Sequence, residues 1–230
     1  MRRTGLRLVV AALVAGGIPI HVLGQERGAE PAPLSVSGSV LWSIQPEGTY
    51  SGSPHNIDAL GGTTVGGAVS LAIGVSRFAS IDVGVRVRGP ISQDNGVSAA
   101  ASVWWRETHR EVALDTAVVF PLHSDRAFHV EPSLGVTFLR GITDRTDVVF
   151  QPFLPEASAQ HTPDETLIDK WFGLASGLDG VFTVTPRAAV VPSLRLYWVP
   201  GRNQNPVQGS PNVRLSNVLC DVGVGLRVSF

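Results

Sequence analysis

The chain is poor in lysine, cysteine and methionine. Among its 230 residues there is one Cys and one Met, and Arg supplies nearly all of the 18 positive charges. A lone Cys220 cannot form an internal disulfide, and we expect it to serve as a small apolar residue in a strand. The formal net charge of −1 gives neither the basic footprint of a nucleic-acid-binding protein nor an acidic tail. Composition therefore excludes a disulfide scaffold and gives no indication of a nucleic-acid partner.

Long apolar runs are also missing from most of the chain. After Gly24 no run reaches the length of about 18 apolar residues that a transmembrane helix requires. Before it, Arg2, Arg3 and Arg7 precede an apolar run over 8–20. This pattern predicts a secretory signal peptide over 1–24, removed after Sec-type export, with an N-terminal membrane anchor as the alternative. No Cys lies near the expected cleavage point, which disfavours a lipoprotein.

The segment 25–33 is polar and contains proline, and we interpret it as a flexible periplasmic leader. From Leu34 onward the dominant sequence period is two, as in β-strands. In FHVEPSLGVTFLR, for example, Phe128, Val130, Leu134, Val136 and Phe138 fall on one face, with small or polar residues between them. The pattern predicts eight strands, at 34–45, 63–75, 80–89, 111–121, 128–140, 169–182, 187–199 and 214–230. Most are longer than the five or so residues typical of soluble strands and fit a tilted membrane crossing of roughly 9–11 residues.

The links between these strands alternate between short and long. Short links such as SRFA (76–79) are typical of tight turns, whereas the long links carry Gly, Pro, Asn and Asp. This alternation is typical of outer-membrane barrels, which have short periplasmic turns and longer extracellular loops. The segment 97–105 also has strand character. We place it in the second long loop, as an extracellular extension of a barrel hairpin, and the choice between eight and ten strands stays open.

The polar face of the predicted strands is rich in Gly, Ala and Ser and carries a few separated charges. Small residues are what the narrow interior of an eight-stranded barrel admits. The charged residues assigned to this face are Asp82, Asp115, Glu131, Asp179, Asp221, Arg86, Arg88, Arg195 and Arg227, with His129 beside them. Because unpaired charges in a confined interior are costly, the near-balance predicts mutual pairing and a charge-filled lumen.

Aromatic residues lie near both ends of the predicted strands. The two predicted girdles are Trp42, Phe138, Phe172 and Trp198 at the loop ends, and Phe78, Phe120, Phe128, Phe182 and Phe230 at the turn ends. Such girdles flank the apolar band of a membrane protein. Pro132 and Pro192 oppose this interpretation, because a closed barrel has no edge strand at which a missing N–H is harmless. We expect a local β-bulge at each proline to accommodate the missing N–H.

With its signal peptide, eight amphipathic strands and terminal LRVSF, the sequence resembles the small outer-membrane β-barrel proteins of the OmpA/OmpX type. The resemblance implies an all-β, eight-stranded antiparallel up-and-down transmembrane barrel over 34–230, located in the bacterial outer membrane. In that family a C-terminal aromatic closes the last strand and is part of what the barrel-assembly machinery recognises. Phe230 occupies this position here, which implies the same partner. We also expect contact with outer-membrane lipid and a monomeric chain.

Some barrels of this size modify lipids, and a nucleophile with a base would be needed for such chemistry. His129, Glu131 and Ser133 share one strand face, but residues i and i+2 lie about 6.6–7 Å apart along a strand, too far for a direct Ser–His bond. Asp144 and Asp147 fit a solvated loop better than a cation site. The sequence therefore predicts no catalytic, cofactor-binding or metal-binding residues, no cofactor and no enzymatic activity.

The function indicated is a structural or interaction barrel whose extracellular loops, mainly 90–110 and 141–168, contact ligands or surfaces. The loop segment VVFQPFLPE (148–156) carries apolar residues that are unusual in a solvated loop. A narrow pore for small solutes is the alternative, and a lipid-modifying enzyme is a weaker one. A soluble lipocalin-like carrier requires the opposite arrangement, with an apolar interior and a polar exterior.

Overall fold

The computed structural model describes residues 34–51, 58–59, 61–76, 78–98, 102–122, 127–150, 160–161, 165–204 and 212–230. The predicted signal peptide (1–24) and leader (25–33) lie outside these residues and stay predictions. Within the described ranges, the chain forms no helix that is long and apolar enough to cross a membrane.

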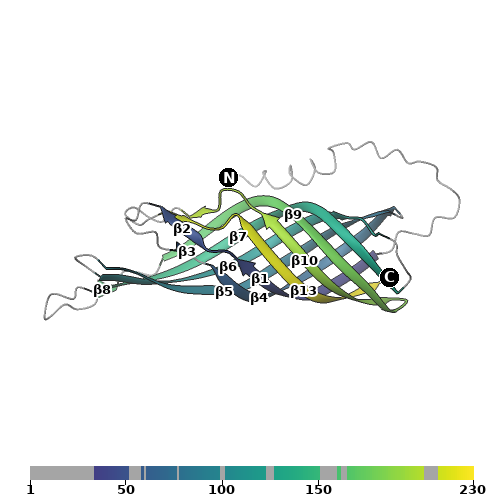
Figure 1. The fold of residues 1–230 in the computed structure, drawn as a ribbon, viewed down its shortest axis with the longest axis horizontal. Coiled ribbons are helices and arrows are strands. Elements are labelled where there is room, and N and C mark those ends of the chain that lie inside the picture. Colours follow the sequence, from purple (N-terminus) through teal and green to yellow (C-terminus); the bar gives the residue numbers. More distant parts are fainter. Residues whose placement is uncertain are drawn as a thin grey trace, which may run out of the picture. The chain divides into compact units, whose positions relative to one another are not determined.

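Eight long strands form a closed antiparallel ring (Figure 1). They are β1 (Leu34–Gln45), β4 (Gly62–Ser76), β5 (Ala79–Ser98), β6 (Ser102–Val119), β7 (Phe128–Phe150), β9 (Glu165–Thr185), β10 (Ala188–Trp198) and β13 (Val218–Ser229). Each pairs with the long strand before and after it, and β1 pairs with β13 to complete the ring. The predicted all-β, eight-stranded up-and-down barrel is confirmed.

The first and last strands meet along nearly their whole length. Their register runs from Ser35 opposite Ser229 to Ile44 opposite Cys220. The backbone N–H of Phe230 donates to the carbonyl oxygen of Leu34 at 2.8 Å, one residue beyond the ladder. The terminal phenylalanine is therefore hydrogen-bonded to the start of β1 at the turn end of the barrel.

Four neighbouring strands continue past the loop end of the others. β5, β6, β7 and β9 have 18 to 23 residues, against 12 in β1 and β13. The prediction that 90–110 and 141–168 are loops was therefore wrong for most of these residues, which lie in paired strands. The alternation continues there, but both faces carry polar residues, so a hydrophobic period does not reveal it. We call the continuation (91–98, 102–110, 141–150 and 165–169) the hairpin extension.

The ambiguous segment 97–105 belongs to this extension. Val97 and Ser98 end β5, Ser102 begins β6, and Ser98 pairs with Ser102. The described residues of this segment thus lie at the end of one barrel hairpin, as placed from the sequence, and the barrel has eight strands.

Short strands add a second, small sheet at the loop end. It consists of β11 (Asn203–Gln204), β12 (Asn212–Arg214), β2 (Gly48–Ser51) and β3 (Asp58–Ala59) in that order. A further two-residue strand, β8 (Gln160–His161), pairs with β7. Strands of two to four residues are too short to show a period, so the sequence does not reveal them.

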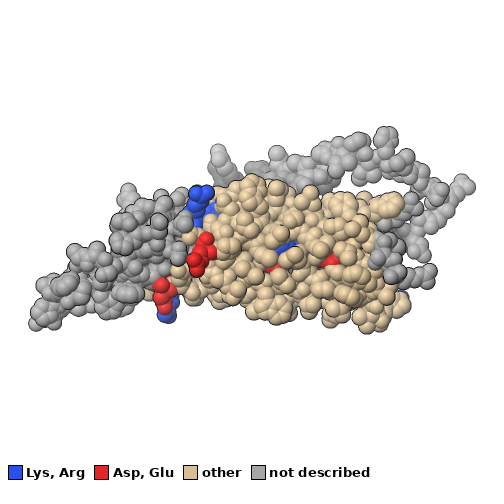
Figure 2. All heavy atoms as spheres, viewed as in Figure 1, with Lys and Arg blue, Asp and Glu red and all other residues tan. Residues whose placement is uncertain are grey.

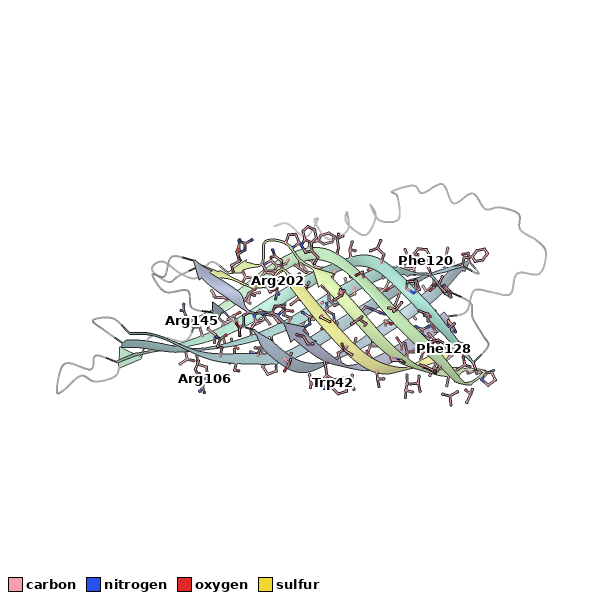
Figure 3. All side chains as sticks on the ribbon, viewed as in Figure 1. Trp42, Arg106, Phe120, Phe128, Arg145 and Arg202 are labelled. Atoms are coloured by element: carbon pink, nitrogen blue, oxygen red, sulfur yellow. The ribbon has the colours of Figure 1, made fainter. Side chains whose placement is uncertain are left out.

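The outer wall of the barrel is apolar. Figure 2 shows a wall almost bare of charged atoms, with Lys, Arg, Asp and Glu mainly gathered toward the loop end of this face. Side chains between 46 and 64% exposed include Val40, Val69, Val85, Leu114, Leu174, Leu196, Val224 and Leu226. Exposed aromatics lie at both ends, among them Trp42 and Phe120 in Figure 3. A soluble protein has its apolar side chains inside and its charges outside. The opposite distribution here matches a lipid-facing surface.

The two in-strand prolines are accommodated without a bulge at either site. Pro132 lies one residue beyond the last β6–β7 ladder pair, Val119 with Ser133, and its carbonyl accepts from the N–H of Phe120 at 2.9 Å. At Pro192 the β9–β10 ladder is interrupted between Val190 and Ser193, with no change of register. The recorded register shift in β10 lies at Ala188 and Ala189 instead, so the expected bulges were wrong.

Candidate functional site

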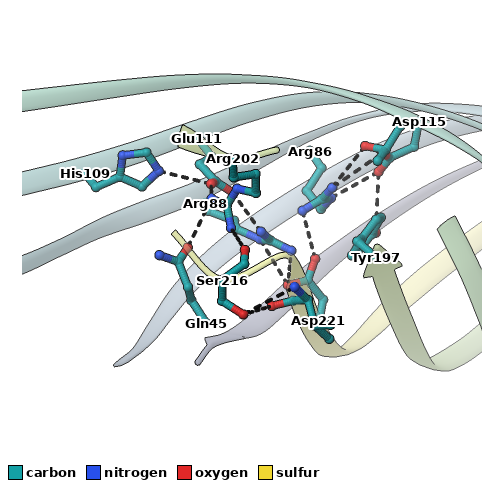
Figure 4. Close-up of polar contacts among 12 residues, drawn as sticks. Gln45, Arg86, Arg88, His109, Glu111, Asp115, Tyr197, Arg202, Ser216 and Asp221 are labelled. Atoms are coloured by element: carbon teal, nitrogen blue, oxygen red, sulfur yellow. Dashed lines mark hydrogen bonds and ion pairs between the residues drawn. The ribbon is translucent and has the colours of Figure 1, made fainter. Parts of the chain in front are cut away.

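The centre of the lumen is organised around Asp221 of β13. This fully buried carboxylate forms ion pairs with two arginines of β5, to Arg86 Nη1 at 3.1 Å and to Arg88 Nη2 at 2.9 Å. Residues 86 and 88 point to the same side because alternate residues of a strand share a face. Figure 4 shows both guanidinium groups converging on Asp221. One carboxylate of the last strand thus bridges two cations of the third strand of the ring.

Each of these arginines has a second carboxylate partner on β6. Arg86 Nε donates to Asp115 at 3.0 Å, and Arg88 Nη1 donates to Glu111 at 2.7 Å. The guanidinium of Arg86 also lies 3.8 Å from the centre of the Tyr197 ring on β10. Asp115 further accepts a hydrogen bond from the Thr137 hydroxyl of β7 at 2.5 Å. The cluster therefore joins five strands across the lumen, and each of its two arginines contacts two carboxylates.

Described residues of the link between β10 and β13 enter the loop end of the lumen. Arg202 follows Gly201, whose positive φ of 70° makes the turn that a residue with a side chain rarely adopts. The Arg202 side chain is fully buried, forms an ion pair with Glu111, and donates to the Ser216 carbonyl at 2.8 Å. Its guanidinium lies 5.2 Å from the Trp171 ring. The link thus places a cation inside the barrel mouth.

Apolar and aromatic side chains pack around this cation. The buried cluster contains Ile91, Ala113, Leu139, Trp171, Ala175, Tyr197, Val199, Leu215 and Leu219. His109 Nε2 lies 3.0 Å from Glu111, and His109 Nδ1 lies 2.7 Å from the Thr143 hydroxyl. The backbone of Gly141 approaches Trp171 so closely that a Cβ at this position would lie 2.5 Å from the ring. The interior at the loop end is therefore tightly filled.

A second cluster lies toward the turn end. Arg195 contacts both oxygens of Asp179, at 2.5 and 2.7 Å, and Arg227 Nη1 donates to Glu131 at 2.7 Å. Arg227 also lies 3.6 Å from Asp179. The Ser70 hydroxyl donates to Asp82 at 3.2 Å. These groups leave space between them, with cavities of about 100 Å³ and about 340 Å³ that share Asp82, Val119 and Arg227 in their walls.

The structure brings together the inward charges expected from the sequence. Asp82, Asp115, Glu131, Asp179, Asp221, Arg86, Arg88, Arg195 and Arg227 all lie at buried or half-buried positions. Sequence reasoning missed Glu111 and Arg202. Glu111 shares the strand parity of Asp115 and could have been found from that spacing. Arg202 lies in a link, and no periodic signal marks it.

The residues considered for catalysis do not form a triad. His129 Nε2 lies 2.9 Å from Glu131, but no hydrogen bond among the described residues joins Ser133 to His129. Asp144 forms an ion pair with Arg110 and accepts from Thr166 at 3.0 Å, and the Asp147 side chain lies outside the described residues. Across the described ranges, no group of three or more His, Cys, Asp and Glu side chains is placed to hold a metal ion.

No protein-family model and no curated protein matches the chain. Solved structures do match its fold. The outer-membrane protein OprG from Pseudomonas aeruginosa is 9% identical, with a TM-score of 0.52 over 86% of this chain and 97% of that one. Ail, the attachment invasion locus protein of Yersinia pestis, is 12% identical, with a TM-score of 0.46 over 87% and 100%. A major outer-membrane protein from Thermus thermophilus is 13% identical, with a TM-score of 0.47 over 85% and 99%. The expected small outer-membrane barrel fold is confirmed.

Proposed function

We propose that this outer-membrane β-barrel is a closed anchor with a charge-filled lumen, and that the hairpin extension is its contact surface. The observation that carries the proposal is the continuation of β5, β6, β7 and β9 beyond the barrel, combined with the filled interior beneath it. Strands of 18 to 23 residues exceed the roughly 9–11 needed for a tilted crossing, so the surplus stands outside the bilayer.

The two faces of the hairpin extension differ in their surroundings. On one face Glu107, His109 and Arg145 are buried, and Arg145 Nε lies 3.5 Å from Glu107. On the other face Arg106 and Asp94 are 67% and 63% exposed and form an ion pair at 2.6 Å, with Arg106 pointing away from the sheet in Figure 3. The hydrogen bonds from Arg106 lower the pKa of the Asp94 carboxyl from its ordinary value. A rigid sheet with an exposed polar face is suited to contact a partner in water.

Truncating the hairpin tests this role. Gln93 and Glu107 are direct ladder partners, so an Asn-Gly pair replacing 94–106 joins them by a two-residue turn without changing register. We expect the shortened protein to fold into the same heat-modifiable barrel but to lose binding of the displaying cells to immobilised cell-surface and matrix material. The matched control keeps full length and carries Arg187→Gln, at the exposed turn between β9 and β10, and should bind like the unaltered chain. Undiminished binding by the truncated barrel overturns the contact role.

A narrow pore is the alternative, and one observation favours it. The cavities of about 340 Å³ and about 100 Å³ adjoin in the turn-end half of the lumen. The packing in the loop-end half of the lumen argues against a pore. The side chains there are each at most 4% exposed, including Arg86, Arg88, Arg202, Asp221 and Leu139. Side chains that are this well packed and paired leave no wet path through the barrel.

Conductance separates the two functions. In a planar bilayer we expect the folded, heat-modifiable protein to give no stable current steps, while a known conducting barrel reconstituted in the same way does. Reproducible steps from the full chain would show that the paired charges do not close the lumen and would establish the pore.

The proposal includes no enzymatic activity and no cofactor. Its support is that the His129 ring nitrogen lies 2.9 Å from Glu131, while no hydrogen bond among the described residues joins Ser133 to His129. A lipid-modifying reaction would need a nucleophile activated by a base within hydrogen-bond reach. No mass change of outer-membrane lipids is therefore expected when the protein is expressed.

We further propose that the chain is a monomer surrounded by outer-membrane lipid and assembled through its last strand. β13 presents Val224, Leu226, Val228 and Phe230 on the outer wall, and Phe230 is 76% exposed. An exposed terminal aromatic on an apolar strand face is available to the barrel-assembly machinery before and after closure with β1.

A further inference from the structure

Two cations stand side by side on the outer wall just below the hairpin extension. Arg140 of β7 and Lys170 of β9 are direct ladder partners, and both are exposed. Lys170 is the only lysine of the chain. Directly opposed residues on neighbouring strands have Cβ atoms about 4.5–5.5 Å apart, so both side chains can reach one ligand.

Neither cation is neutralised by a described acid. The exposed arginines nearby are different, because Arg106 pairs with Asp94 and Arg110 pairs with Asp144. No ion pair among the described residues involves Arg140 or Lys170. Asp169, next to Lys170, falls on the opposite face of the strand by parity. Like charges directly opposite one another are destabilising, so an adjacent pair of cations favours an external anion.

The rows around the pair fix its depth. The ladder row toward the barrel centre contains Leu114, Phe138 and Phe172, which are 49, 43 and 56% exposed. The row on the other side contains exposed Arg110, half-buried Ile142 and Ile168, and Ile168 is 52% exposed. The cations therefore lie about 6.6–7 Å beyond the aromatic row, at the border between the apolar wall and the polar hairpin extension. This is the interface where headgroups meet acyl chains, and where long basic side chains extend toward phosphates.

We propose that Arg140 and Lys170 form a binding site for the phosphate of an anionic lipid headgroup in the membrane leaflet at the loop end. A guanidinium donates two parallel hydrogen bonds to a phosphate, and an ammonium adds a compact charge. The aromatic row on the barrel side of the cations contacts the acyl chains, and Ile168 in the next row adds apolar surface beside the headgroup. A free anion in water makes no contact with apolar side chains, so the site fits a membrane lipid better than a soluble phosphate.

The test uses the full folded barrel and phosphorylated lipid A as the probe. Binding is measured by native mass spectrometry in detergent micelles for the unaltered chain and for Arg140→Gln/Lys170→Gln. We expect at least about a tenfold weaker affinity in the double variant, equivalent to about 1.4 kcal/mol. Dephosphorylated lipid A should bind both proteins equally. Arg187→Gln, at the exposed turn between β9 and β10, is the matched control and should bind like the unaltered chain.

The single lysine supplies a second measurement that does not depend on the double variant. An amine reagent can modify only Lys170 and the chain terminus, and peptide mass spectrometry separates the two. Modification of Lys170 should be slower in phosphatidylcholine vesicles containing lipid A than in phosphatidylcholine alone, and Arg140→Gln should remove much of that protection. Equal lipid A affinity in the unaltered and doubly substituted barrels overturns the site. Protection by inorganic phosphate as strong as that by lipid A overturns the lipid as its ligand.

Discussion

Asp221→Ala is expected to lower the free energy of unfolding by about 3 kcal/mol. Removing one member of a buried ion pair typically costs about 3–5 kcal/mol, because the remaining charge loses its compensation without regaining water. Arg86 and Arg88 each keep a second carboxylate, Asp115 or Glu111, which places the expected cost at the lower end of that range. The measurement is a denaturant titration of the barrel in lipid vesicles, followed by tryptophan fluorescence.

Two further variants test whether charge compensation causes the loss of stability. Asp221→Asn keeps the side-chain shape and removes the charge, so it should show most of the loss if charge compensation is the cause. Asp94→Ala removes an exposed acid from an exposed pair and should leave the unfolding midpoint unchanged within error. An Asp221→Ala barrel as stable as the unaltered one would mean that the paired charges do not stabilise the lumen.

Val69→Arg is expected to cost about 2–4 kcal/mol, or to prevent stable insertion altogether. An arginine on the lipid face of a transmembrane barrel has this cost at the bilayer midplane, and only about 0–1 kcal/mol near the interface. Val69 is 62% exposed and lies midway along β4. The same denaturant titration in vesicles, together with the fraction of protein that becomes heat-modifiable, measures the effect.

Val75→Arg is the matched control on the same strand and the same face. Val75 is 49% exposed and lies at the turn end of β4, so its substitution should cost far less. A cost at Val69 no larger than that at Val75 would contradict the assignment of the apolar wall to lipid. An insensitivity of both positions would favour a protein partner covering the wall.

The barrel strands were predictable because both of their faces carry a signal. In β1, apolar residues such as Leu34 and Val36 alternate with serines, and the predicted bounds 34–45 match the observed ones. In the hairpin extension, side chains also alternate between the two faces of the strand. Glu107 and His109 are buried, whereas Arg106 is exposed and Thr108 is half-buried. Because neighbouring residues of the hairpin extension are all polar, the hydrophobicity pattern does not reveal that they form strands.

The membership of the charged cluster was predictable, but most of its partnerships were not. Strand parity alone places Arg86, Arg88 and Asp221 inside. Which acid meets which base depends on the stagger of neighbouring strands, since Arg88 and Asp221 are separated by 133 positions in the chain. Arg202 was beyond prediction because its position depends on a link that folds into the mouth.

The position of Asp221 on the last strand also has a consequence for assembly. Arg86 and Arg88 belong to the third long strand of the ring and Asp221 to the last, so these ion pairs require both strands to lie in one closed ring. Until β13 lies between β10 and β1, Arg86 and Arg88 keep Asp115 and Glu111 but lack Asp221, and Glu131 lacks Arg227. Since β13 carries both Asp221 and Arg227, its docking joins the seam, leaves the net charge of the lumen unchanged and completes both sets of ion pairs in one step. An open or misregistered ring therefore lacks these central ion pairs and is less stable than the closed barrel.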